Sequence, residues 1–287
     1  MTQKTEQKVI GVDLGGTKIL AGSVLNDHLI SQHKTLVPKG GTESEVLSAL
    51  YAAIDPLFDA EVAGIGVGVP SIVDAERGIV YDVQNIPSWK KVHLKDLLEQ
   101  RYKVPVFLNN DANCFAVGEK YFGKGQGYQN FVGLICGTGI AAGLVVHNKL
   151  YNGYNCGAGE FGMLPYLDQY IEYYASGQFF QNVHQIDGGL VFQQAQKGDP
   201  TALALFQEFG THLGVAIKTV LYTLDPEVII MGGSVAQAYP FFEKTMWESI
   251  RSLAYPSIVE RLTIKISDHP DVAVLGAAAL YYNALQD

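Results

Sequence analysis

Cysteine is scarce in this chain of 287 residues. It occurs three times, as Cys114, Cys136 and Cys156. An odd number at such wide spacing excludes a disulfide framework and a CxxC zinc pair, and favours a reducing compartment. The first 13 residues, MTQKTEQKVIGVD, also lack the pattern of a signal peptide. We therefore expect a cytoplasmic protein.

Long apolar runs and an excess of basic charge are missing as well. No run reaches the roughly 20 apolar residues of a membrane span, so we expect no membrane association. The 20 lysines and arginines are outnumbered by 29 aspartates and glutamates, which gives a net charge of −9. Because nucleic acids are bound by clustered basic side chains, we expect no nucleic-acid partner. An acidic protein can still bind ATP through backbone N–H groups and Mg²⁺.

The sequence contains two similar glycine hairpins. Hydrophobic residues make up 48% of the chain and charged residues 17%, a globular composition that suits one large domain or two of ordinary size. Residues 9–24, VIGVDLGGTKILAGSV, form two apolar runs around a glycine turn, which predicts a β-hairpin. Residues 131–147, FVGLICGTGIAAGLVVH, repeat this pattern. The echo predicts two related α/β halves.

Further elements follow from hydrophobic periodicity. The expected strands are 62–69, which ends before Pro70, 106–111 and 226–232, and the expected helices are 43–58, 94–102, one beginning at Ala112, most of 175–222, and 271–285.

Three of the expected strands end in glycine turns, written DLGGT, CGTGI and MGGS. One such turn alone is most often only a turn. Together they offer exposed backbone N–H groups to which a phosphate can come close, because glycine has no Cβ in the way. The spacing matches neither a P-loop nor a dinucleotide-binding GxGxxG before a helix.

Two aspartates stand at expected strand ends. Asp13 precedes the first glycine pair and is either a turn-capping residue or a carboxylate that holds Mg²⁺ near phosphates, directly or through water. Lys18 contacts a phosphate or is solvated. Asp111 is the N-cap of the helix that follows or a general base, because α/β folds place chemistry at strand carboxyl ends, and the two roles do not exclude one another. A phosphoryl transfer to a sugar hydroxyl needs such a base.

The motifs together resemble one family. VDLGGTKILAG, GVGVPSIVD, NIPSW, NNDANCFAVGE, ICGTGIAAG, GAGEFG, YASG, DPEVIIMGGS and LGAAAL occur in the order seen in ROK family sugar kinases, among them bacterial glucokinases, and span about residues 9–280. The resemblance implies the actin-like, ribonuclease-H-like ATPase fold, with two α/β domains around a cleft and often a homodimer. We expect the domains to be 1–114 joined by 272–287, and 115–271.

The resemblance also implies residue roles. Asp13 resembles the magnesium-organising aspartate, and Asp111 the catalytic base. The phosphate and nucleotide contacts implied are Gly15, Gly16, Thr17, Lys18, Gly137, Thr138, Gly139, Gly232 and Gly233. The sugar contacts implied are Asn85, Asn110, Asp111, Glu160 and Glu172.

The chain departs from the family where a structural zinc is bound. Family members carry a histidine and three cysteines there, whereas this chain has Met163 at the histidine position and Tyr170 at the last cysteine position, and lacks the other two cysteines. Four donors are needed for such a site, and Cys156 lies outside the block, so we predict no structural zinc. We expect four tyrosines to pack this loop instead: Tyr166, Tyr170, Tyr173 and Tyr174.

The expected activity is phosphorylation of a hexose at its 6-hydroxyl, with ATP and Mg²⁺ and with glucose as the first candidate. The family histidine also contacts the sugar, so Met163 leaves fructose or an N-acetylhexosamine open as the acceptor, and polyphosphate stays open as the donor. The alternative of another class is a non-catalytic sugar-sensing regulator, because the family also contains repressors.

Overall fold

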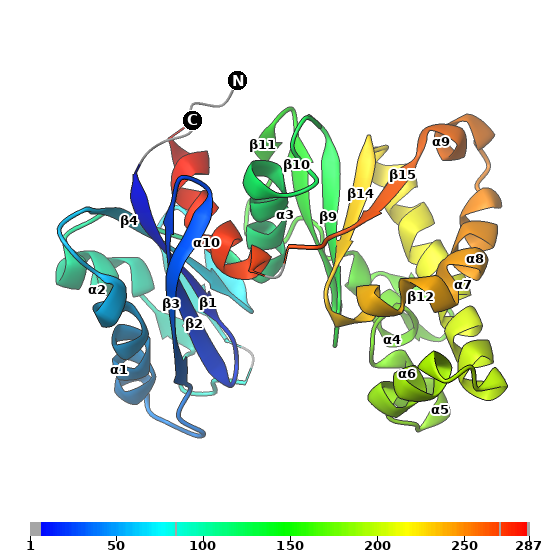
Figure 1. Cartoon of the computed structure of the whole chain (residues 1–287), viewed down its shortest axis with the longest axis horizontal. Coiled ribbons are helices and arrows are strands. Elements are labelled where there is room, and N and C mark those ends of the chain that lie inside the picture. Colours follow the sequence, from blue (N-terminus) through cyan, green and yellow to red (C-terminus); the bar gives the residue numbers. More distant parts are fainter. Residues whose placement is uncertain (1–6, 84, 270, 286–287) are drawn as a thin grey trace. The chain divides into compact units, whose positions relative to one another are not determined.

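The computed structural model describes residues 7–83, 85–269 and 271–285. The chain divides into two compact units, which we describe separately (Figure 1). The first comprises Met1–Gly127, Gly143–Ala158 and His269–Asp287, and the second comprises Tyr128–Ala142 and Gly159–Asp268. We expected the first domain to end at residue 114. That position lies inside a helix, and the whole of this helix belongs to the first unit.

The first unit contains most of the N-terminal elements and the last helix. These are β1 (Lys8–Leu14), β2 (Lys18–Leu25), β3 (His28–Leu36), α1 (Glu43–Ile54), β4 (Val62–Val69), β5 (Ile72–Asp74), β6 (Ile79–Tyr81), β7 (Lys91–Val92), α2 (Leu94–Tyr102), β8 (Val106–Asn110), α3 (Asp111–Phe122), β11 (Lys149–Leu150) and α10 (Val272–Ala284). A short 3₁₀ helix, Asp55–Leu57, follows α1 because Pro56 cannot continue the α-helix.

The central sheet of this unit has the strand order β3-β2-β1-β4-β8. The predicted first hairpin is confirmed, because β1 and β2 pair antiparallel with Gly11 opposite Gly22. Strand β1 pairs in parallel with β4, and β4 pairs in parallel with β8. The carboxyl ends of β1, β4 and β8 therefore meet at one edge of the sheet.

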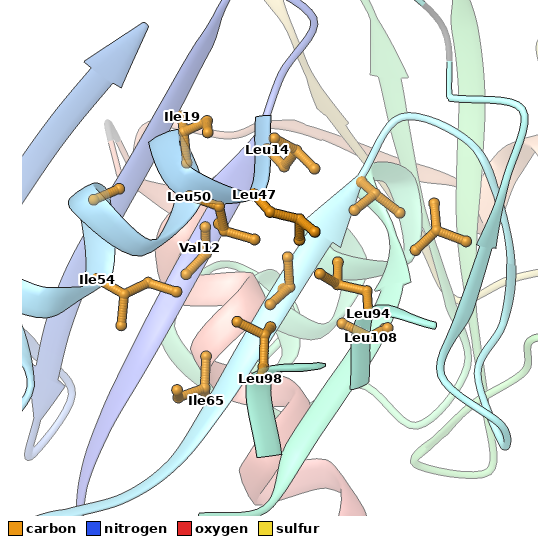
Figure 2. Close-up of a cluster of buried hydrophobic side chains, with 14 of the residues drawn as sticks. Val12, Leu14, Ile19, Leu47, Leu50, Ile54, Ile65, Leu94, Leu98 and Leu108 are labelled. Carbon is orange, nitrogen blue, oxygen red and sulfur yellow. The ribbon is translucent and has the colours of Figure 1, made fainter. Parts of the chain in front are cut away.

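One face of this sheet forms the larger core. Ile10, Val12 and Leu14 alternate along β1 and are fully buried, as a period of two residues requires. They pack with residues of α1 and α2, among them Leu50 and Leu98 (Figure 2).

Glycines on the other face of the sheet admit α10. A Cβ atom at Gly11 would lie 2.0 Å from the carbonyl oxygen of Val274, and one at Gly66 would lie 1.8 Å from that of Ala277. The alternation of glycine with β-branched residues in VAGIGVGV therefore separates the two faces of β4: the branched residues fill the core and the glycines lie under α10 and α3. Helix α10 packs in turn against α3, where a Cβ at Gly276 would meet a backbone carbonyl at 2.0 Å.

The second unit contains the remaining elements. These are β9 (Phe131–Cys136), β12 (Pro165–Tyr166), β13 (Gln169–Tyr170), α4 (Ile171–Ala175), α5 (Phe179–His184), α6 (Gly188–Gln196), α7 (Pro200–Leu224), β14 (Val228–Gly232), α8 (Tyr239–Arg251), α9 (Pro256–Arg261) and β15 (Thr263–Ile266), with 3₁₀ helices η2 (Phe161–Met163) and η3 (Ser234–Ala238). Strand β10 (Ile140–Val146) is divided between the units after Ala142.

The second large sheet repeats the topology of the first. Its order is β11-β10-β9-β14-β15, with β14 parallel to both β9 and β15. In chain order each sheet therefore runs third, second, first, fourth, fifth, which confirms the internal similarity expected from the two glycine hairpins.

The sequence patterns did not predict β3 or the small sheet β5-β6-β7. Strand β3, HLISQHKTL, lies at the sheet edge, and most of its residues are exposed on both faces. It therefore lacks the alternation that marks a half-buried strand. Among the described residues, no helix combines the length and the apolar character that crossing a bilayer requires.

Replacing Gly66 by valine should destabilise the protein. The new side chain would overlap the carbonyl of Ala277, so α10 would have to shift, at a cost of about 1–3 kcal/mol in unfolding free energy. Urea denaturation measures this change. Gly157→Ala is the matched control, because a Cβ there meets no atom within 4 Å. Equal stability of both variants and the wild type would contradict the packing described here.

Candidate active site

Asp13 lies near the carboxyl end of β1. The strand alternation places its side chain on the face that carries Gly11 and α10, and it is half-buried. Burial raises the pKa of its carboxyl, the negative charge of Asp111 raises it further, and Lys18 opposes both. A divalent cation would relieve the repulsion between the two aspartates, and Mg²⁺ commonly takes one or two protein carboxylates together with phosphates. The donor set of this unit therefore fits Mg²⁺.

Asp111 is the first residue of α3, and its role as N-cap is corrected by the structure. The N-cap is Asn110, whose side-chain oxygen accepts the N–H of Asn113 at 2.7 Å. The Asp111 carboxylate accepts the neighbouring N–H of Ala112 at 2.9 Å. Its side chain is exposed to solvent, yet the surrounding protein removes part of its hydration shell. This desolvation raises the pKa of the carboxyl. Asn110 thus caps the helix and leaves Asp111 accessible.

The first glycine loop lies beside Asn85. Gly15 closes the turn by donating its N–H to the carbonyl of Lys18 at 2.9 Å. A Cβ at Gly16 would be only 2.6 Å from Cβ of Asn85, which is exposed and has a left-handed φ of 65°. Thr17 and Lys18 are exposed. The structure thus brings together the first predicted phosphate loop and one predicted sugar contact within the first unit.

The second and third glycine loops meet within the second unit. Gly232 ends β14, and Gly233 follows with a φ of 89°. A Cβ at Gly233 would be 2.3 Å from the carbonyl oxygen of Cys136, the last residue of β9. One at Gly137 would lie 3.7 Å from the Ser234 hydroxyl. CGTG and MGGS therefore form one surface of closely packed backbone, with the side chain of Thr138 exposed.

Glu172 is attached to the second glycine loop. Its Oε2 accepts the N–H of Ile140 at 2.9 Å, and a Cβ at Gly139 would be 2.4 Å from that oxygen. On the other side of α4, Gly177 donates its N–H to the carbonyl of Gly137 at 2.7 Å. The loop is therefore held from both ends of α4.

Glu160 differs from Glu172 in its surroundings. It precedes η2, and its side chain is exposed. Its carbonyl accepts the N–H of Met163, and Met163 is itself 53% exposed. Glu160 and Met163, the methionine at the family's histidine position, thus lie on one short turn.

The four predicted tyrosines pack together, as expected, and a histidine joins them. The rings of Tyr166 and Tyr174 lie 5.6 Å apart, those of Tyr173 and Tyr174 lie 5.0 Å apart, and Tyr170 contacts Tyr173 at 6.2 Å. The Tyr166 hydroxyl is 3.0 Å from Nδ1 of His212 on α7. Ring contacts thus hold the β12-β13 hairpin on α7.

No group of three or more His, Cys, Asp or Glu residues is arranged to hold a metal ion in the described part of the chain. The three cysteines are buried and free. The absence of structural zinc remains a prediction for metal analysis of the purified protein.

Comparison with known proteins assigns the family. The model of the ROK family matches residues 9–284. The chain belongs to the ROK family. The glucokinase of Thermotoga maritima is 32% identical, over 95% of this chain and 96% of the relative. A xylose repressor of Caldicellulosiruptor bescii is 24% identical, over 95% of this chain and 77% of the relative.

A solved structure supports the fold of this ROK protein. The ROK glucokinase from Streptomyces griseus, in complex with glucose and AMPPNP, has 29% sequence identity and a TM-score of 0.80, and the match covers 95% of this chain and 98% of that one. The chain has the actin-like, ribonuclease-H-like ATPase fold, as the resemblance implied.

Two groups of residues around the candidate site did not emerge from the sequence. Asn113 and Asn152 form amide hydrogen bonds with each other and with Asn109, and His212 completes the tyrosine cluster. The spacing of Asn109 and Asn113, four apart across a helix start, was a usable signal for the first group. His212 carried none, because its partners lie about 40 residues earlier in the chain.

The contribution of His212 to stability should depend on pH. Burial lowers the pKa of His212 below its ordinary value of 6.5, with Glu208 opposing and His184 adding to this effect. The unfolded chain then binds the proton more strongly, so the contribution is complete above about pH 6.5 and is lost as the pH falls below it. When the pH falls from about 8 to about 5.5, the unfolding free energy of His212→Gln should therefore decrease by less than that of the wild type. Urea denaturation at the two pH values measures both decreases.

His33→Gln is the control for this experiment, because His33 is exposed on the edge strand β3. It should follow the wild type at both pH values. An unchanged pH dependence in His212→Gln would contradict the prediction.

Proposed function

We propose that this ROK protein transfers a phosphoryl group from ATP to the 6-hydroxyl of a hexose, with glucose as the preferred acceptor. The observation that carries the proposal is the accessible carboxylate of Asp111 at the start of α3, in a helix capped by its neighbour Asn110. The similarity to glucokinases along nearly the whole chain supports it. So does the complex of one relative with glucose and the ATP analogue AMPPNP.

Asp111 acts as the general base in this proposal. It accepts the proton of the sugar hydroxyl as the oxygen attacks the γ-phosphate. Burial raises the pKa of the Asp111 carboxyl, and a raised pKa makes the carboxylate a stronger base. The N–H of Ala112, which binds one carboxylate oxygen, fixes its direction and leaves the other oxygen to the substrate.

The glycine loops hold the phosphates. Gly16 and Thr17 with Lys18, then Thr138 and Gly139, offer N–H groups, hydroxyls and one ammonium. Gly15 and Gly137 use their own N–H groups to close the two turns, and lacking a Cβ they let a phosphate come close. Gly232 and Gly233 serve the adenosine side. A larger residue at Gly16 would collide with Asn85, and one at Gly139 with Glu172. Bound Mg²⁺, held near Asp13 directly or through water, would neutralise phosphate charge.

The sugar is held by amides and carboxylates. We assign this role to Asn85, Asn110, Glu160 and Glu172, besides Asp111. The Asn110 amide donates one N–H to the carbonyl of Cys156 and retains a second for a sugar hydroxyl. Met163 offers a thioether, a weak acceptor, where the family has histidine. Fructose and N-acetylhexosamines are therefore the alternative acceptors.

The similarity to a xylose repressor favours a second candidate function, that of a non-catalytic sugar sensor. A sensor needs the sugar contacts but neither the base nor the phosphate loops. The presence of Asp13, Asp111 and all three glycine loops supports the kinase.

Asp111→Asn should lower kcat by about 10²–10⁴-fold, the usual contribution of a general base. Asparagine has nearly the same shape and retains an oxygen for the N–H of Ala112, so hexose affinity should change little. Steady-state kinetics and calorimetry measure the two effects. Asp96→Asn, an exposed acid in the first turn of α2, should leave both unchanged. Undiminished turnover in Asp111→Asn would remove Asp111 from the proposal.

A panel of hexoses tests the activity itself. ADP release in a coupled assay should be fastest with glucose, and slower with fructose and N-acetylglucosamine. A faster reaction with another sugar would replace glucose as the acceptor. Calorimetric binding of a sugar without ADP release for any member of the panel would support the sensor instead.

A further inference from the structure

Three asparagines form a polar cluster inside the first unit, which we call the amide cluster: Asn109, Asn113 and Asn152. Asn109 is 3% exposed and Asn113 is fully buried. Asn109 ends β8 together with Asn110, Asn113 lies in the first turn of α3, and Asn152 follows β11. The cluster therefore joins the start of α3 to a segment about 40 residues later in the chain.

Asn152 connects the other two side chains. Its Oδ1 accepts one N–H from Nδ2 of Asn109 at 3.0 Å and one from Nδ2 of Asn113 at 3.2 Å. Nδ2 of Asn113 also donates to Oδ1 of Asn109 at 2.8 Å. A single oxygen of Asn152 thus closes a ring of three amides.

The amide cluster continues into the backbone that carries the proposed base. Oδ1 of Asn109 accepts the backbone N–H of Asn110 at 2.9 Å. Asn110 then caps α3, and its Nδ2 donates to the carbonyl of Cys156, which comes from the same segment as Asn152. Both residues before Asp111 are therefore held by side-chain hydrogen bonds to the segment 152–156.

One buried polar atom of the amide cluster does not contribute to the stability of the fold. Oδ1 of Asn113 is buried and has no hydrogen-bond partner among the described residues. An unpaired buried amide oxygen carries a cost in stability. A core of leucine or valine would avoid that cost, whereas amides fix the position of a helix start through directed bonds.

From this geometry we propose that Asn152 is a positioning residue for Asp111, and that it acts through Asn109 and Asn113 to hold the first turn of α3. The inference rests on the proposed function, since it assigns the segment 152–156 to the alignment of the base. Asn152 does not contact the reacting atoms in this scheme.

Asn152→Ala removes the oxygen that both neighbouring amides share. We expect kcat to fall about 10- to 100-fold, the effect of a small misplacement of a catalytic group, while the KM for ATP stays within about twofold. Hydrogen exchange should become several-fold faster at the backbone N–H groups of Asn110 and Asn113, with no change in β1 and β2.

Two further variants complete the test. Asn152→Asp retains an acceptor oxygen at the same place and should keep the slow exchange of the wild type. Asn155→Ala, an exposed residue in the same segment, should keep both exchange and kcat. Unchanged exchange in Asn152→Ala, or a KM for ATP that rises as kcat falls, would overturn the positioning role. If the wild-type protein phosphorylates no hexose, the proposed function is wrong. The exchange measurement would still show whether Asn152 holds the start of α3.

Discussion

The first unit depends on the close approach of α10 to the central sheet. Gly11 and Gly66 lack side chains, so the carbonyl groups of α10 lie directly on β1 and β4. The same helix packs on α3, which begins with Asp111. Because β1, β4 and β8 are parallel, their carboxyl ends meet at one edge, and this places Asp111 close enough for its charge to raise the pKa of Asp13.

The second unit is organised by backbone contacts instead. Gly233 packs on the carbonyl of Cys136, and Glu172 binds the N–H of Ile140, so the glycine loops and α4 form one assembly. Next to it, the hairpin that follows η2 is held by tyrosine rings and His212. Aromatic pairs of this kind contribute about 0.5–1.5 kcal/mol each beyond burial, enough together to hold a short hairpin.

Much of the fold could be predicted because its patterns are local. The hairpin of residues 9–24, the helix 94–102 and the closing helix follow from periodicity and glycine turns, and the structure confirms them. Strand β3 was missed because an exposed edge strand needs no apolar alternation. The role of Asp111 as N-cap was wrong by one position, because Asn and Asp cap helices about equally well and only the hydrogen bond of Asn110 distinguishes them.

Sequence alone determined the family and the two-sheet α/β organisation, and it predicts the residues of the candidate site, because those depend on motif order and local periodicity. Tertiary structure alone decided which of these residues touch. It joined Gly16 to Asn85 and Gly139 to Glu172, and it linked Asn152 to the start of α3. Such contacts connect positions about 30 to 70 residues apart, and a hydrogen bond or a steric overlap forms only when folding brings both partners to one place.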